Sequence, residues 1–270
     1  MKKKKVLIAL HIIMLIIITF CGGLWGCKFV QNEIRQNKEI FELQNDISLL
    51  KAEIKELNNS SKVEYSDTAF NYLALGNSIT LHGGADYWWN EIGMAASSEE
   101  KDYVHLISSH LKSLYGELCM NVMNYSVWEM QTADRAETYQ LIENYLDKRL
   151  DLVTIQLSEN VNDMTTFEAD FEELIRYVRK CAPNAQIIII DDFWSSDDKS
   201  LLKEKAANNT GADFVSLDSI KGKKEYQCGM NTTVYDAEGK AHIVNHDGVA
   251  IHPGDKGMKY IADSVISALE

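Results

Sequence analysis

Proline and basic residues are scarce in this chain. Its 270 residues include 2 prolines, and 27 lysines and arginines stand against 40 aspartates and glutamates, so the formal net charge is -13 at pH 7. So little proline argues against a Pro-rich disordered arm. Because a strongly acidic chain repels nucleic acid at long range, we expect no nucleic-acid partner and favour neutral or positively charged ones.

Paired cysteines are also absent. The cysteines stand singly, at positions 21, 27, 119, 181 and 228, without a Cys-x-x-Cys pair. This spacing argues against a zinc knuckle or a dithiol redox site, and it defines no disulfide framework. We expect no cofactor and no bound metal, and the alternative of a histidine-based metal site is given below. The 46% of hydrophobic residues is enough to bury a substantial core.

Residues 1–28 have the pattern of a membrane anchor. Four lysines, Lys2–Lys5, precede an apolar run over 6–20 whose character continues to Trp25. Roughly 20 apolar residues span a bilayer, and lysines hold the adjoining end in the cytoplasm. We predict a single-pass anchor in the cell membrane, with the N-terminus cytoplasmic and the rest of the chain outside. A cleaved signal peptide and a lipid anchor at Cys27, in a sequence that resembles a bacterial lipobox, are the alternatives.

Residues 29–61 favour a coiled-coil stalk that ends in a polar linker. Two sets of apolar residues recur every seven positions in this segment, namely Ile40, Ile47 and Ile54, and then Leu43, Leu50 and Leu57. Isoleucine at a and leucine at d favours parallel two-stranded coiled coils. We therefore predict a homodimer formed through this stalk. The alternative is a single amphipathic helix that lies on its own globular domain.

The remaining residues, 62–270, alternate short apolar runs with amphipathic helical segments. The apolar runs lie at 72–76, 120–125, 152–157, 186–190 and 213–217, and the helical patterns lie at 103–115, 133–150, 167–181, 201–208 and 256–269. Unbroken apolar runs suit strands that are covered on both faces. The pattern predicts a three-layer α/β/α domain with a five-stranded parallel sheet, which binds ligands at the carboxyl ends of its strands.

Two polar stretches follow predicted strands at that edge of the sheet. Ser78, in the sequence Gly-Asn-Ser-Ile-Thr after the first strand, has the position of a nucleophile at a helix start, although a Gly-Asn turn with a Ser/Thr cap explains it equally. Asn160 follows the third strand and can donate a hydrogen bond into the same crevice, or cap the following loop. His252, before Pro253 near the C-terminus, can face this edge or lie on the surface.

Together these stretches resemble the SGNH/GDSL hydrolase family. Gly76–Thr80 is similar to its first block, with asparagine in place of aspartate, and Ser158–Asn160 is similar to its Gly-x-Asn block, with serine in place of glycine. Asp247–Pro253 is similar to its closing Asp-x-x-His block, with two extra residues between acid and base. The blocks have the same order as in the family, and the resemblance covers roughly residues 68–270.

The resemblance implies Ser78 as nucleophile, His252 as base and Asn160 as oxyanion donor. The backbone N–H of Ser78 is a second donor, and Ser126 is the candidate for the donor that the family's second block supplies from a glycine, which residues 124–129 lack. Asp247 is the candidate acid if the loop folds back onto the imidazole. Otherwise Ser78 and His252 act as a dyad, with a main-chain carbonyl orienting the imidazole. A carboxylate neighbour predicts a histidine pKa near ~6.5 or somewhat higher.

Aromatic residues near the predicted strand ends suggest the substrate. Trp88, Trp89 and Trp128 are candidates for stacking against sugar rings, although ordinary packing explains them equally, and Asn77 stands beside the nucleophile. With the predicted location, these residues indicate an extracytoplasmic esterase that removes O-acyl groups, such as acetyl, from a surface glycan.

Two other functions remain open. One is a degenerate hydrolase that binds a glycan without cleaving it. The other is a metal site built from His242, His246, Asp247 and His252, for which the spacing of ligands is not diagnostic.

Overall fold

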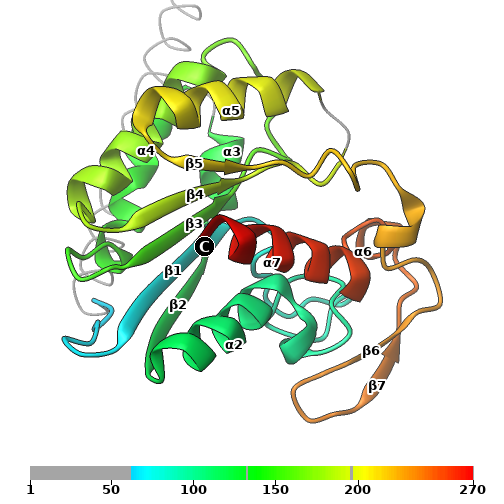
Figure 1. The fold of residues 1–270 in the computed structure, drawn as a ribbon. Helices are drawn as coiled ribbons and strands as arrows, with labels where there is room; N and C mark the ends of the chain where they lie inside the picture. Colours follow the sequence, from blue (N-terminus) through cyan, green and yellow to red (C-terminus); the bar gives the residue numbers. More distant parts are fainter. Residues whose placement is uncertain (1–61, 132, 195–196, 270) are drawn as a thin grey trace, which may run out of the picture. The chain divides into compact units, whose positions relative to one another are not determined.

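The computed structural model describes residues 62–131, 133–194 and 197–269 (Figure 1). The predicted membrane anchor over 1–28 and the predicted stalk over 29–61 lie outside the described residues. Within the described ranges, no helix combines the length and the apolar character needed to cross a bilayer.

A five-stranded parallel sheet forms the centre of the domain, as the sequence predicts. Its strands stand in the order β2 (Leu118–Asn124), β1 (Phe70–Gly76), β3 (Leu152–Gln156), β4 (Gln186–Ile190) and β5 (Asp213–Val215). Every neighbouring pair of strands is parallel. The carboxyl ends of β1 and β3 therefore lie side by side, since Gly76 pairs with Gln156.

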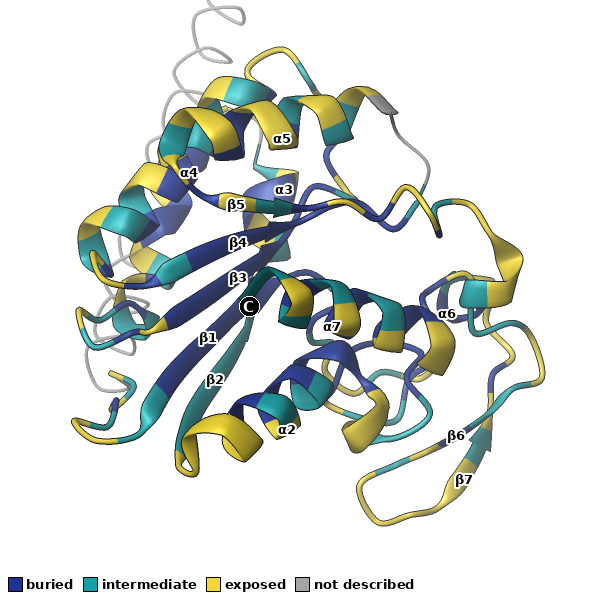
Figure 2. Ribbon diagram, viewed as in Figure 1, coloured by how far each residue is buried: buried dark blue, intermediate teal, exposed yellow. Residues whose placement is uncertain are grey.

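Helices cover both faces of the sheet and complete the three layers (Figure 1). One layer holds α2 (Tyr103–Tyr115) and α7 (Asp255–Leu269), which pack against each other. The other holds α3 (Ser126–Met130), α4 (Phe167–Cys181) and α5 (Asp197–Thr210). Because successive strand residues point to opposite faces, Tyr72 and Ala74 join the core under the first layer, whereas Leu73 and Leu75 join the core under the second. Figure 2 shows how completely the central strands are buried.

The helix predicted over 133–150 does not form. The segment contains two short 3-10 helices, Arg135–Leu141 and Glu143–Tyr145, because tertiary contacts outweigh its helical propensity. Arg135 is buried, lies 5.1 Å from the ring centroid of Trp128 and forms an ion pair with Asp170 of α4. The hydroxyl of Thr138 donates to the carbonyl of Arg135.

Several small elements lie outside the predicted pattern. They are the antiparallel pair β6 (Thr233–Tyr235) and β7 (Ala241–Ile243), the helices α3 and α6 (Asp247–Ala250), and the 3-10 helices Glu99–Lys101 and Lys224–Tyr226. The short α6 matters most for function because it immediately precedes His252.

Gly76 ends β1 at a position where no side chain fits. A Cβ there would lie 1.8 Å from the Thr80 hydroxyl oxygen and 2.8 Å from the Gln156 carbonyl oxygen. The glycine thus allows β1 to turn sharply beside β3, and this turn carries Ser78.

Candidate active site

Ser78 lies in a tight turn at the carboxyl end of β1. The Asn77 carbonyl accepts hydrogen bonds from the backbone N–H groups of Thr80 and Leu81, at 3.0 Å each. The Asn77 side chain, which is fully buried, accepts from the N–H of Ile79 at 3.0 Å. The structure therefore places Asn77 inside the turn, where it holds the backbone on either side of Ser78, and not on a surface open to substrate.

The structure brings Ser78 and His252 together although 174 positions separate them. Their Oγ and Nε2 atoms are 2.8 Å apart. On the other side of the ring, Nδ1 lies 2.5 Å from the carbonyl oxygen of Gly248. Because a carbonyl can only accept, Nδ1 carries the proton, and Nε2 is left as the acceptor for the serine hydroxyl. This is the arrangement that a general base next to a nucleophile requires.

Asp247 is placed differently from what an acid member of a triad requires. It begins α6 and is exposed, and its backbone carbonyl accepts from Ile251 N–H at 3.2 Å. Within the described residues, no hydrogen bond or ion pair joins its carboxylate to His252. The segment between Asp247 and His252, which is two residues longer than the family's closing block, forms a helical turn. This turn directs the carbonyl of Gly248, four positions before the histidine, at the imidazole. The main-chain carbonyl of Gly248 thus orients the imidazole, as expected for a dyad.

Burial sets the protonation state of His252. The residue is 8% exposed, and desolvation lowers its pKa to about 4. The hydrogen bond to Gly248 acts in the opposite direction, and the nearby His82 adds to the lowering. This direction differs from the one expected for an imidazole beside a carboxylate. At neutral pH the ring is uncharged and is able to accept a proton.

Two of the three predicted oxyanion donors retain an uncommitted proton. In the described part of the chain, the backbone N–H of Ser78 has no intramolecular acceptor. The exposed Asn160 donates one Nδ2 proton to Glu129 Oε2 at 2.6 Å, and its amide nitrogen carries a second proton. The N–H of Ser126, in contrast, donates to Asn124 Oδ1 at 3.0 Å.

The predicted substrate-binding tryptophans have different environments. Trp128 is fully buried and packs edge-to-face on Phe171 with 5.5 Å between ring centroids, and Trp88 is 1% exposed. Both belong to the core, so their rings are closed to solvent. Trp89 is partly buried and stacks on His242, with ring centroids 4.5 Å apart and planes 11° from parallel.

Trp194, which is not among the aromatic residues proposed from the sequence, contacts the base directly. Its ring lies edge-to-face on His252 with 4.9 Å between centroids, and its Nε1 donates to the carbonyl of Ile251 at 3.0 Å. The signal available in the sequence was its position shortly after β4, at the same edge of the sheet as Ser78.

A buried charge pair behind the site was not predicted. Lys203 of α5 is fully buried and donates to Asp192 Oδ1 at 2.9 Å and to the carbonyls of Leu157 and Ile190. The hydroxyl of Ser158 also donates to Asp192. Because Leu157 follows β3 and Ile190 ends β4, the ammonium group ties these two strand ends together.

The partly buried Glu159 places a second carboxyl group next to this pair. Burial raises the pKa of Glu159 well above its ordinary value, and the nearby Asp192 raises it further. Its Oε1 accepts from the N–H of Phe193 at 2.5 Å. Nothing in the sequence indicates this environment, since Glu159 stands inside a polar stretch.

The histidines considered for a metal site have separate partners. His242 bonds to Asp236 at 2.8 Å, His246 stacks on Tyr87 at 4.6 Å between centroids, and His252 bonds to Ser78. In the described ranges, no group of three or more His, Cys, Asp or Glu side chains has the arrangement of a metal site.

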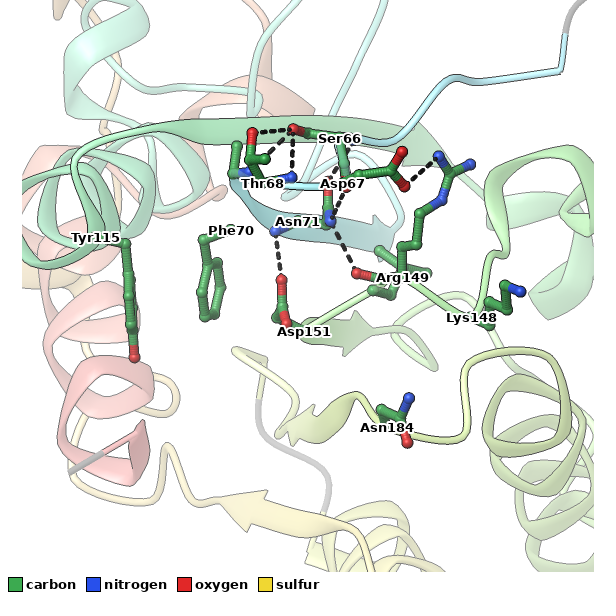
Figure 3. A pocket seen from close by; sticks show the side chains of 12 residues that line it. Ser66, Asp67, Thr68, Phe70, Asn71, Tyr115, Lys148, Arg149, Asp151 and Asn184 are labelled. Atoms are coloured by element: carbon green, nitrogen blue, oxygen red, sulfur yellow. Dashed lines mark hydrogen bonds and ion pairs between the residues drawn. The ribbon is translucent and has the colours of Figure 1, made fainter.

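Cavity size does not mark this site. A cavity of about 630 Å³ lies at the opposite, amino ends of β1 and β3, lined among others by Asn71, Tyr115 and Arg149 (Figure 3). Asn71 and Arg149 are engaged there in bonds that hold the chain's entry into the sheet. Ser78 and His252 do not line this cavity. The candidate site is therefore identified by the hydrogen bond between Ser78 Oγ and His252 Nε2.

No protein-family model matches the sequence, and no curated protein matches it. Among solved structures, the chain is similar to an extracellular lipase from Streptomyces rimosus, with 16% identity, a TM-score of 0.47 and coverage of 74% of this chain and 100% of the other. It is also similar to a two-domain esterase active on acetylated mannans, with 16% identity, a TM-score of 0.47 and coverage of 83% and 52%. A third similar structure is a family two carbohydrate esterase from Clostridium thermocellum in complex with cellohexaose, with 14% identity, a TM-score of 0.45 and coverage of 77% and 65%.

Proposed function

We propose that this chain is a serine esterase that removes O-acyl groups from a carbohydrate through a Ser78–His252 dyad. The observation that carries the proposal is the 2.8 Å contact between Ser78 Oγ and His252 Nε2, with Nδ1 held by the Gly248 carbonyl. This geometry fixes the imidazole tautomer that can accept the serine proton. The resemblance of the motifs around Ser78, Asn160 and His252 to those of SGNH/GDSL hydrolases supports the same chemistry.

The reaction is acyl transfer to water in two steps. His252 Nε2 takes the proton of Ser78 as Oγ attacks the ester carbonyl, and the same proton then passes to the departing sugar hydroxyl. His252 then takes a proton from a water molecule that attacks the acyl-enzyme, and it passes this proton to Ser78 Oγ as the bond between Oγ and the acyl group breaks and the carboxylic acid leaves. The N–H of Ser78 and the second amide proton of Asn160 stabilise the negative oxygen in both steps.

A carbohydrate substrate is supported by the rings near the dyad. His82 lies close enough to His252 to affect its pKa, and its ring centroid is 5.9 Å from that of Tyr87. Tyr87, in turn, stacks on His246 and is 36% exposed. Flat, partly exposed rings beside a polar site suit the apolar faces of sugars.

We also propose, from the sequence, that residues 1–28 anchor the chain in the cell membrane and that residues 29–61 pair two copies. The esterase domain then acts outside the cytoplasm on a surface glycan. Light scattering tests the pairing, because a chain that begins near Lys28 is expected to be dimeric and one that begins at Lys62 monomeric. Equal masses would count against the stalk.

Replacement of the nucleophile tests the proposed activity. We expect Ser78→Ala to lower the turnover of aryl acetates and acetylated glycans by several orders of magnitude, with folding intact, since no other group replaces Oγ. A serine-reactive fluorophosphonate should label the parent at Ser78 and leave the variant unlabelled. A parent that binds glycans but shows neither labelling nor turnover would instead be a binding module.

A further inference from the structure

Polar groups from two strand ends converge on one buried carboxylate. Glu129 lies on α3 and is 1% exposed. Its Oε1 accepts from Asn77 Nδ2 at 3.0 Å and from the backbone N–H of Ser158 at 2.6 Å. Its Oε2 accepts from Asn160 Nδ2 at 2.6 Å. All the donors are N–H groups, so the ionised carboxylate, which only accepts, satisfies each of them.

The groups held by Glu129 are those that shape the catalytic edge. Asn77 immediately precedes Ser78 and fixes its turn. Ser158 has a φ of 114° and begins the turn that presents Asn160. This backbone conformation is costly for a residue with a side chain, and the short bond from its N–H to Glu129 helps to maintain it.

The charge of Glu129 also decides which end of the Asn160 amide faces it. A side-chain amide has a donor end and an acceptor end of nearly the same shape, and a carboxylate accepts only the donor end. With the nitrogen fixed in this way, the second Nδ2 proton remains for the oxyanion. If the amide turned over, its carbonyl oxygen would occupy that place and repel the oxyanion.

We propose that Glu129 is a positioning residue of the esterase, which selects the amide orientation of Asn160 and so maintains the oxyanion donor. This inference rests on the proposed function. It does not give Glu129 a contact with substrate, since its side chain is enclosed and acts through Asn160.

Glu129→Gln is the sharpest variant because it keeps the size of the side chain and removes the charge. Its single carbonyl oxygen can still accept from Asn77 and Ser158, and its NH₂ group then faces Asn160. The Asn160 amide must turn over to accept that bond. We expect kcat for an aryl acetate to fall roughly 10²–10³-fold, as for loss of an oxyanion donor, with little change in KM.

A double-mutant cycle shows whether Glu129 acts through Asn160. We expect Asn160→Ala alone to cost roughly the same 10²–10³-fold, and Glu129→Gln to cost less than about threefold more in that background. Glu117→Gln, the same chemical change at an exposed site, is the matched control and should leave kcat and KM unchanged.

The outcomes separate the two proposals. Parental kcat in Glu129→Gln, or losses from Glu129→Gln and Asn160→Ala that simply multiply in the double variant, would overturn the positioning role. A raised KM with a lowered melting temperature and unchanged kcat would assign Glu129 to folding alone and also overturn it. If the parent itself shows no turnover and no fluorophosphonate labelling, the esterase function fails, and the role of Glu129 in it fails with it.

Discussion

Ser78 and His252 meet at one hydrogen bond, but the segments that carry them are held by different chemistry. The nucleophile turn is enclosed, with Asn77 and Ser158 fully buried and their bonds converging on Glu129. His252 follows the short helix α6 and is oriented by the Gly248 carbonyl, four positions earlier. A buried carboxylate organises one half of the pair, and local backbone organises the other.

A buried carboxylate and a main-chain carbonyl respond differently to substitutions of nearby side chains. Interior carboxylates must have partners, so removing one partner leaves an unpaired buried charge and affects every group bound to it. A main-chain carbonyl cannot be removed by changing a side chain. Activity should therefore tolerate substitutions around His252 that do not alter the helical turn before it. Single substitutions among the buried groups around Ser78 should lower activity strongly.

The largest effect is expected from His252→Ala, which removes the only group within hydrogen-bond distance of Ser78 Oγ among the described residues. Turnover of an aryl acetate should fall by several orders of magnitude because the serine hydroxyl loses its general base. The melting temperature serves as the control for folding. Retention of a tenth or more of the parental turnover by a folded variant would show that another base serves Ser78.

Lys203→Met tests the segments around the nucleophile through the buried charge pair of Lys203 and Asp192. The substitution leaves Asp192 without its cation, and we expect the free energy of unfolding to fall by about 3–5 kcal/mol. Denaturant titration measures this loss. Lys203→Met combined with Asp192→Asn, in which neither member of the pair carries a charge, should recover part of the stability. A loss below ~1 kcal/mol for the single variant would mean that the pair contributes little to holding β3 and β4.

The pH dependence of kcat/KM tests the protonation state and the orienting group of His252. His252 must be neutral to accept the serine proton, and its pKa is lowered to about 4, so activity should be present above this pH and be lost as the pH falls through it. The rate should be nearly flat between about pH 5 and 8. Circular dichroism at each pH controls for acid unfolding. An acidic limb near ~6.5 or above would indicate a carboxylate next to the imidazole.

The smallest effect is expected from Asp247→Asn. The carboxylate is exposed and does not contact His252, so turnover should change less than about threefold at a pH above the acidic limb. Comparison with His252→Ala at the same pH separates a dyad from a triad. A loss of orders of magnitude would show that the loop folds back during catalysis and brings Asp247 to Nδ1.

Local patterns in the sequence were sufficient for the fold and for part of the site. Unbroken apolar runs such as Ile187–Ile190 predict buried strands, and the structure confirms the five-stranded parallel sheet. The helix expected over 133–150 was wrong because Arg135 turns inward to Trp128 and Asp170. Helical propensity could not include this contact with a distant part of the chain.

The sequence by itself determined the five strands of the sheet and the positions of Ser78 and Asn160 after two of them, because strand periodicity and turn chemistry are local. For His252 it offered the family resemblance and two possible locations. Only the tertiary structure decided how these groups are oriented. It buried Trp128, left Asp247 exposed, turned the Gly248 carbonyl to the imidazole and brought Glu129 to Asn77, Ser158 and Asn160. The physical reason is that burial and hydrogen-bond partnership depend on residues far apart in the chain, which no spacing within one motif records.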